Sequence, residues 1–174
     1  MPDADRLPMT SRLLLGAIAG AAATVAMTAA MNRLHRRLPA DERYPLPPRE
    51  ITESLLPQLS DDDAIKDGAT AAHHGYGAVS GALIAAAAPN IGLSGGALAG
   101  VGVWAASYFG WVPAAAILQP AHRHPVRTNA LMIAAHIVWG AVAAGAVREL
   151  EAPRSTTLRA GPLKDAVKEQ NGEQ

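Results

Sequence analysis

Charged residues are confined to a few parts of the chain, and the stretches between them are apolar. Residues 13–32 contain no Asp, Glu, Lys or Arg, and neither do residues 68–122 or 128–147. A membrane core of about 30 Å needs roughly 20 predominantly apolar residues per helix. The first and last stretches each fit one crossing, and the middle stretch of 55 residues is long enough for two.

The cluster Pro89-Asn90-Ile91-Gly92 favours a turn that divides the middle stretch. A soluble helical bundle is the alternative, because alanine forms helices well and is only weakly hydrophobic. A soluble helix needs a polar face, however, and Ser107 is the only polar residue of the third segment apart from the edges of aromatic rings. We therefore predict an all-α membrane protein, a bundle of four Ala/Gly-rich transmembrane helices at about residues 13–31, 71–88, 97–118 and 130–147.

The remaining segments are predicted to be tails and a loop. Residues 1–12 form an N-terminal tail, and residues 148–174, with low hydrophobicity, form a disordered C-terminal tail. The polar, Pro-rich loop 32–70 is expected to be extended at Leu46-Pro47-Pro48-Arg49 and to form a short amphipathic helix at 51–59, interrupted by a proline. The first apolar stretch exceeds the usual ~7–15-residue core of a signal peptide, so we expect it to be retained.

Small residues recur at four-residue spacing in all four segments. This spacing places them on one face of each helix. Because lipid supplies no hydrophobic drive between helices, membrane helices associate where small residues let their backbones approach. Ala/Gly-rich segments also produce such spacing by chance. We predict helix packing through Gly16, Gly20, Gly77, Gly81, Gly96, Gly100 and Gly140.

Two of the predicted helices share a sequence pattern. His73-x-x-Tyr76-Gly77-Ala78-Val79 matches His136-x-x-Trp139-Gly140-Ala141-Val142. The match predicts a duplicated helical hairpin, as is common in membrane folds, although so biased a composition also produces short matches by chance.

The six histidines all fall at or near one end of the predicted bundle. We call the end that carries the N-terminus end A and the opposite end B. His136 is expected roughly 9 Å inside end B, given the rise of 1.5 Å per residue. Pro113, at a similar depth, removes a backbone hydrogen bond to the Phe109 carbonyl and is predicted to kink the third helix.

Three interpretations of the histidines remain open. Imidazoles suit transition metals, and a proton-responsive cluster is the second interpretation. The third is that they only form hydrogen bonds between helices or lie in loops. The candidate metal ligands are His73, His136, His122 and His124.

The chain contains one motif typical of enzymes. Gly92-Leu93-Ser94-Gly95-Gly96, followed by Gly100, resembles the serine motif of rhomboid proteases. Ser94 is expected at end A, roughly 20 Å across the bilayer from His73 and His136, beyond hydrogen-bond reach. We therefore predict no catalytic residues, no enzymatic activity and no cofactor other than a metal. The balance of 15 Lys and Arg against 15 Asp and Glu gives no reason to expect nucleic-acid binding.

Several features resemble the YagU-like family of uncharacterised small bacterial inner-membrane proteins. These are the Gly/Ala-rich first helix followed by Pro45-Leu46-Pro47-Pro48-Arg49, the His-led second helix, and Ala135-His136-Ile137-Val138-Trp139. The resemblance implies a four-helix inner-membrane protein of unknown activity with both termini cytoplasmic, and marks His136 and Arg49 for mutation. Lys and Arg do not decide the orientation, since seven lie toward end A and eight toward end B.

The sequence thus predicts a non-enzymatic integral inner-membrane protein with a His-lined, proton- or metal-responsive site on one membrane face. One alternative is a small oligomeric channel or transporter. The other is a membrane assembly partner that packs through its glycine stripes. The expected partners are the lipid bilayer and further copies of the chain.

Overall fold

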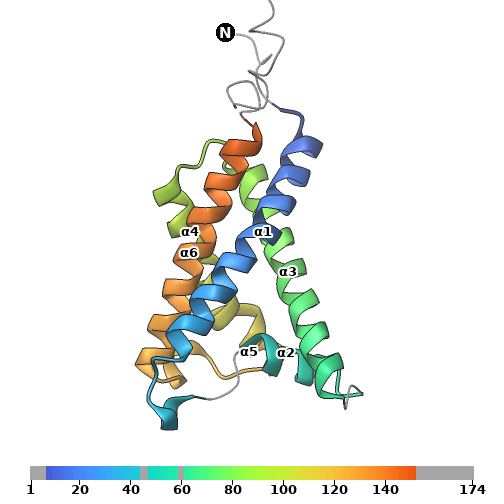
Figure 1. The fold of residues 1–174 in the computed structure, drawn as a ribbon. Coiled ribbons are helices and arrows are strands. Elements are labelled where there is room, and N and C mark those ends of the chain that lie inside the picture. The colour runs from blue at the N-terminus through green and yellow to red at the C-terminus, as the bar shows by residue number, and fades with distance from the viewer. Residues whose placement is uncertain (1–6, 44–46, 59–60, 152–174) are drawn as a thin grey trace, which may run out of the picture.

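The computed structural model describes residues 7–43, 47–58 and 61–151, which form helices and no strand (Figure 1). The prediction of an all-α bundle is confirmed. A π turn at Ser107–Trp111 joins α4 to α5, and short 3-10 turns lie at Ala40–Glu42 and Ala121–Arg123. The α-helices are α1 (Met9–His35), α2 (Pro47–Leu55), α3 (Asp62–Ala87), α4 (Leu93–Ala106), α5 (Val112–Ala114) and α6 (Val126–Glu151).

The four long helices pack in the order α3–α1–α6–α4. The broad contacts are those of α1 with α3, α4 with α6, and α1 with α6, whereas α3 barely touches α6. Helix α1 begins and α6 ends at the same end of the bundle, end A (Figure 1). At end B, α2 packs against the start of α3, and α1 and α3 diverge.

Two helices of the described part of the chain, α1 and α6, are long and apolar enough to cross a membrane. Helix α4 has 14 residues, and the helical segment that it begins ends at Ala114 rather than near residue 118. Helix α3 has 26 residues, but its first turns are charged and it carries His73 and His74. The prediction of four membrane-spanning helices is therefore confirmed only as a helical bundle in which two helices could cross a membrane.

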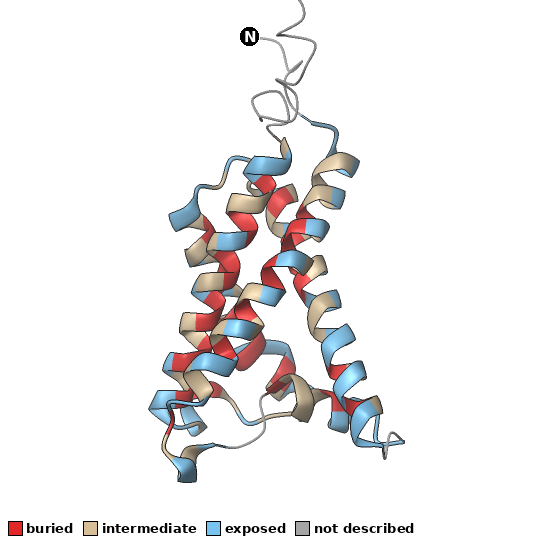
Figure 2. Cartoon of the chain, viewed as in Figure 1, coloured by how far each residue is buried: buried red, intermediate tan, exposed pale blue. Residues whose placement is uncertain are grey.

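Figure 2 shows that buried residues line the inner faces of the helices, where small residues pack beside larger ones such as Met27, Trp104 and Trp139, while many large apolar residues lie on the outside. Ala19, Ala23 and Thr24 are almost fully buried in α1. On the outer surfaces, Leu83 of α3 is 62 % exposed and Leu98 of α4 is 74 % exposed. Leucines are most often buried in water-soluble proteins, so these exposed side chains differ from that pattern.

The bundle consists of two helical hairpins, one formed by α1 and α3 and the other by α4 and α6. Glycines bring the helix backbones into contact within each hairpin. A Cβ atom on Gly20 of α1 would overlap the Gly77 carbonyl oxygen of α3. In the second hairpin, a Cβ atom on Gly140 of α6 would overlap the Gly96 carbonyl oxygen of α4. Gly77 and Gly140, which are matched positions of the two sequence patterns, thus occupy the same place in the two hairpins. The other glycines at these contacts are Gly16, Gly81 and Gly100.

Polar groups satisfy the ends of α3. The Asp61 carboxylate accepts a hydrogen bond from the Ala64 amide at 2.9 Å and so caps the helix start. At the other end, the Arg12 guanidinium of α1 donates to the carbonyls of Ala85, at 2.9 and 3.2 Å, and of Ala86. These carbonyls have no partner within the helix, and the helix dipole favours a cation there.

The loop between α1 and α3 is more helical than the sequence suggested. Pro47 and Pro48 were expected in an extended segment, but they form the first turn of α2. A proline costs nothing there, because the first amides of a helix have no acceptor within it. Helix α2 ends at Leu55, two residues before Pro57. Residues 152–174 of the predicted C-terminal tail lie outside the described residues.

Substitution of the contact glycines tests the close approach of the helices. We expect Gly20→Ala and Gly140→Ala to lower the free energy of unfolding by about 1–3 kcal/mol, because the new methyl group meets a backbone carbonyl that cannot move alone. Gly102→Ala is the matched control, since a Cβ atom there meets nothing within 4 Å. Reversible unfolding in mixed detergents measures all three. Equal stability of the three variants would contradict the packing.

Candidate functional site

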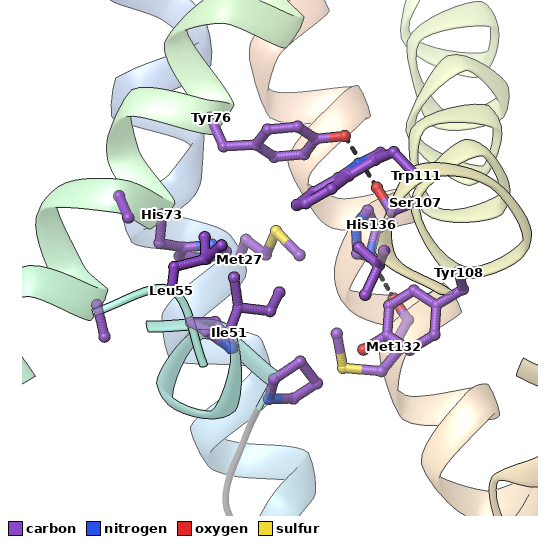
Figure 3. Close-up of a pocket in the computed structure, with 15 residues that line it drawn as sticks. Met27, Ile51, Leu55, His73, Tyr76, Ser107, Tyr108, Trp111, Met132 and His136 are labelled. Atoms are coloured by element: carbon purple, nitrogen blue, oxygen red, sulfur yellow. Dashed lines mark hydrogen bonds between the residues drawn. The ribbon is translucent and has the colours of Figure 1, made fainter. Parts of the chain in front are cut away.

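A cavity of about 230 Å³ lies near end B, surrounded by α1, α2, α3, α6 and the π turn (Figure 3). It has room for about eight groups the size of a water molecule. Its wall is mostly apolar, with two imidazoles and a few hydroxyl groups. The lining residues are Met27, Pro47, Pro48, Ile51, Leu55, Ala69, Ala72, His73, Tyr76, Ser107, Tyr108, Trp111, Val112, Met132 and His136.

His136 is buried in the middle of α6. Its Nδ1 lies 2.8 Å from the Met132 carbonyl oxygen, and since a carbonyl only accepts, Nδ1 carries the proton. The neutral ring then offers Nε2 as an acceptor. Because α6 begins at Val126, His136 lies ten residues, or roughly 15 Å, along the helix. His136 thus lies further from the start of its helix than the roughly 9 Å expected from the sequence.

His73 projects from α3 toward the same cavity (Figure 3). Its Nε2 is buried and has no hydrogen-bond partner in the described part of the chain. The neighbouring His74 is satisfied differently, since its Nδ1 donates to the Thr70 carbonyl at 2.9 Å. A buried polar atom without a partner costs free energy and often marks the place of a water or a ligand.

A hydrogen-bond chain crosses the gap between α3 and the π turn. Ser107 Oγ donates to the Val103 carbonyl at 2.8 Å, so the Tyr76 hydroxyl, 2.8 Å away, donates to Ser107 Oγ. The Tyr76 ring also lies against that of Trp111, with centroids 5.9 Å apart. These contacts form the wall of the cavity where α3 and α4 do not otherwise pack broadly.

The predicted kink lies upstream of Pro113. The chain leaves α geometry at Ser107, where the Val112 amide donates to the Ser107 carbonyl in π fashion, and Gly110 has φ −108° and ψ −110°. Pro113 lies in the first turn of α5. A proline ring clashes with the carbonyl four residues before it, here that of Phe109. Such π turns often occur at functional sites.

The four candidate metal ligands are not brought together. His73 and His136 line the cavity, whereas His122 and His124 lie at the Ala121–Arg123 turn and its end. His124 Nε2 bonds with the Gln119 carbonyl at 2.8 Å, and its ring packs on Tyr108. Among the residues that the structure describes, no three His, Asp or Glu side chains gather to hold a metal ion. The described residues therefore give no support to a metal site formed by all four histidines.

Ser94 lies apart from the histidines. It is exposed in the first turn of α4. Gly100, six residues further on, packs against the His136 carbonyl, so Ser94 is roughly 9 Å from His136 along the bundle axis. This offset is shorter than the roughly 20 Å expected, but still exceeds hydrogen-bond reach. The absence of enzymatic activity stays a prediction.

Sequence reasoning missed much of the cavity wall. It singled out Ser107 as the polar residue of the third helix but not its bond with Tyr76. It also did not foresee that Ile51 and Leu55 of α2 would cover the cavity. The amphipathic pattern of α2 was the available signal, but a pattern does not tell which surface a helix will cover.

A double-mutant cycle tests the bond between α3 and the π turn. We expect Tyr76→Phe and Ser107→Ala each to lower the free energy of unfolding by about 1 kcal/mol, and the double variant to lose little more than either single one. The coupling energy is then about 0.5–1.5 kcal/mol, in the range for hydrogen bonds between membrane helices. Fully additive losses in reversible unfolding would show that the two hydroxyls do not interact.

Comparisons of the chain with protein-family models, with curated proteins and with solved structures gave no match. The resemblance to the YagU-like family therefore stays a prediction, and the cavity itself is the feature from which a function can be inferred.

Proposed function

We propose that this chain is a multi-pass membrane protein that binds a small, mostly apolar molecule in the cavity between His73 and His136. The observation that carries the proposal is the pairing of an apolar wall with a buried imidazole nitrogen, His73 Nε2, that has no hydrogen-bond partner among the described residues. Ligand sites are typically apolar clefts in which a few polar groups fix the orientation of the ligand. His73 Nε2 would accept a hydrogen bond from the polar part of the ligand or donate one to it.

Membrane insertion is supported by the outer surface of the bundle. Helices α1 and α6 are each long and apolar enough for a crossing, and α3 and α4 present exposed large apolar residues such as Val79, Leu83 and Leu98. In lipid, these side chains need no further cover. We place the protein in a bacterial inner membrane with end A, and so both termini, in the cytoplasm. The histidine-lined cavity then opens toward the periplasmic face.

The packing at end A favours binding over passage through the bundle. Toward that end, the space between the four helices narrows to a void of about 20 Å³ lined by glycine, alanine and branched aliphatic residues. A second void of about 20 Å³, beside Thr24, Ser80 and Trp139, lies next to the histidines. Each has room for about one water molecule. A channel or transporter would therefore need further copies of the chain or a large movement.

Single cysteines test the membrane arrangement, because the natural chain has none. Arg123→Cys lies at end B and Arg148→Cys in the last turn of α6, at end A. In intact cells, we expect a membrane-impermeant maleimide to label R123C, and to label R148C only after permeabilisation. Release of the protein from membranes by alkaline carbonate would contradict membrane insertion, and the opposite labelling pattern would reverse the orientation.

Quenching of tryptophan fluorescence tests the cavity, because Trp111 lies in its wall. We expect 8-bromo-1-octanol, whose bromine quenches nearby tryptophan, to quench the protein saturably in nanodiscs of neutral lipid. Ala72→Phe should abolish the saturable component, because Ala72 lines the cavity. Ala71→Phe, at the neighbouring position that does not line the cavity, should retain it.

Trp111→Phe identifies the residue that reports binding. We expect this variant to lose most of the saturable quenching, since Trp104 and Trp139 are not among the residues that line the cavity. Linear quenching of equal slope in the wild type, in Ala72→Phe and in Ala71→Phe would mean that the probe only partitions into lipid. The proposed function would then be abandoned.

A further inference from the structure

A second, open pocket of about 750 Å³ adjoins the apolar cavity. The two share Pro48, Ala69 and His73 in their walls. The open pocket lies between the end-B parts of α1 and α3, where these helices diverge, and α2 contributes Pro48 and Arg49. Its lining differs sharply from that of the cavity, because it contains Arg43, Arg49, Lys66 and three histidines but no Asp or Glu.

Two of the three Arg and Lys side chains that line the open pocket are paired with carboxylates. Arg49 forms ion pairs with Glu53 at 2.8 Å and Asp62 at 2.7 Å, and Lys66 pairs with Asp62 at 3.0 Å and Asp63 at 3.2 Å. The hydrogen bonds from Lys66 and Arg49 hold the pKa of Asp62 below its usual value, so this carboxylate is charged at neutral pH. Arg49 and Lys66 thus contribute little unbalanced positive charge.

Arg43 differs from these two cations. Its Nε donates to the Leu38 carbonyl at 2.8 Å and its Nη2 to the Arg36 carbonyl at 2.9 Å. It forms no ion pair with any other residue in the described part of the chain. Among the described residues, these two neutral acceptors leave the charge of the guanidinium uncompensated and its Nη1 without a partner, which suits an anionic oxygen.

Two buried polar atoms lie in the wall of the open pocket. The first is His73 Nε2, whose ring lines both spaces, and the second is Thr28 Oγ1 of α1. Neither has a hydrogen-bond partner within the described residues. The two adjoining spaces thus combine an apolar wall, two hydrogen-bonding atoms and the Arg43 guanidinium.

We propose that the two spaces together bind an anionic amphiphile, with its alkyl chain in the apolar cavity and its phosphate or carboxylate head at Arg43. His73 and Thr28 hydrogen-bond the atoms that join the head to the chain. The inference rests on the proposed function, because the chain of the amphiphile occupies the same cavity. The cavity holds about eight methylene-sized groups, so a longer chain extends into the surrounding lipid.

Competition against 8-bromo-1-octanol tests the head-group preference, with octyl phosphate and 1-octanol as probes of equal chain length. In neutral-lipid nanodiscs, we expect octyl phosphate to displace the brominated probe at a lower concentration than 1-octanol does. Arg43→Gln should lower the affinity for octyl phosphate about fivefold, which is the effect of one basic residue near a membrane surface. The affinity for 1-octanol should stay unchanged. Arg43→Lys should retain most of the preference because it keeps the charge.

Controls separate a local effect from a general one. Arg37→Gln removes the same charge from an exposed position outside the pocket and should change neither affinity. Lys66→Gln, in the pocket wall, should lower the affinity for octyl phosphate less than Arg43→Gln does, because Lys66 is already paired with two carboxylates. Equal affinities of the two probes, or an equal loss of both in Arg43→Gln, would overturn the inference and leave the cavity proposal standing. Failure of both probes to compete would instead count against the cavity.

The lipid composition of the nanodisc tells whether the amphiphile is a lipid of the bilayer or a free single-chain molecule. If the natural ligand is an anionic lipid of the bilayer, replacing part of the neutral lipid by phosphatidylglycerol should raise the concentration of octyl phosphate needed for displacement. An unchanged concentration would assign the site to a free single-chain amphiphile. Inorganic phosphate alone should displace nothing, because it lacks the chain, and displacement by it would overturn the amphiphile inference.

Discussion

Contact between helix backbones at the glycine positions sets the spacing of this bundle. Gly20 lies on the Gly77 carbonyl, and Gly140 on the Gly96 carbonyl, so each hairpin closes at the shortest distance that two helices allow. Toward end B from the contact glycines Gly77 and Gly140, α3 carries His73 and α6 carries His136 and then Met132. These three side chains line the cavity. The cavity therefore lies where the glycine stripes end, and its histidines stand at its inner edge.

Much of the bundle follows from local sequence, because the spacing of small residues fixes which face of each helix can approach another. The residues that contact across helices, such as Gly16 and Gly100, were therefore readable. The spacing does not say which face meets which helix, so the central pairing of α1 with α6 could not be predicted. The bond from Trp139 Nε1 to the Gly20 carbonyl, 3.0 Å long, depends on that pairing. So does the Tyr76–Ser107 bond, which joins residues 31 positions apart.

The depth of the histidines could not be judged from apolar stretches alone. Helix α6 begins four residues before the apolar stretch suggested, since Val126 and Arg127 already belong to it. A helix continues through polar residues as long as its backbone is hydrogen-bonded, whereas hydropathy marks only the apolar part. The same effect extended α3 back to Asp62 and turned Pro47 and Pro48 into the start of α2. Residues of these three helices, α2, α3 and α6, together line the cavity.

The division into two hairpins joined along α1 and α6 has an evolutionary consequence. Most contacts of α3 and α4 stay within their own hairpin, so either helix can change in sequence without a compensating change in the other half. Two contacts join the halves and constrain such changes. One is the α1–α6 seam, where Trp139 donates to the Gly20 carbonyl, and the other is the hydrogen bond between Tyr76 and Ser107. In a set of related chains, substitutions should therefore be correlated between the halves along this seam and around the cavity, and independent elsewhere.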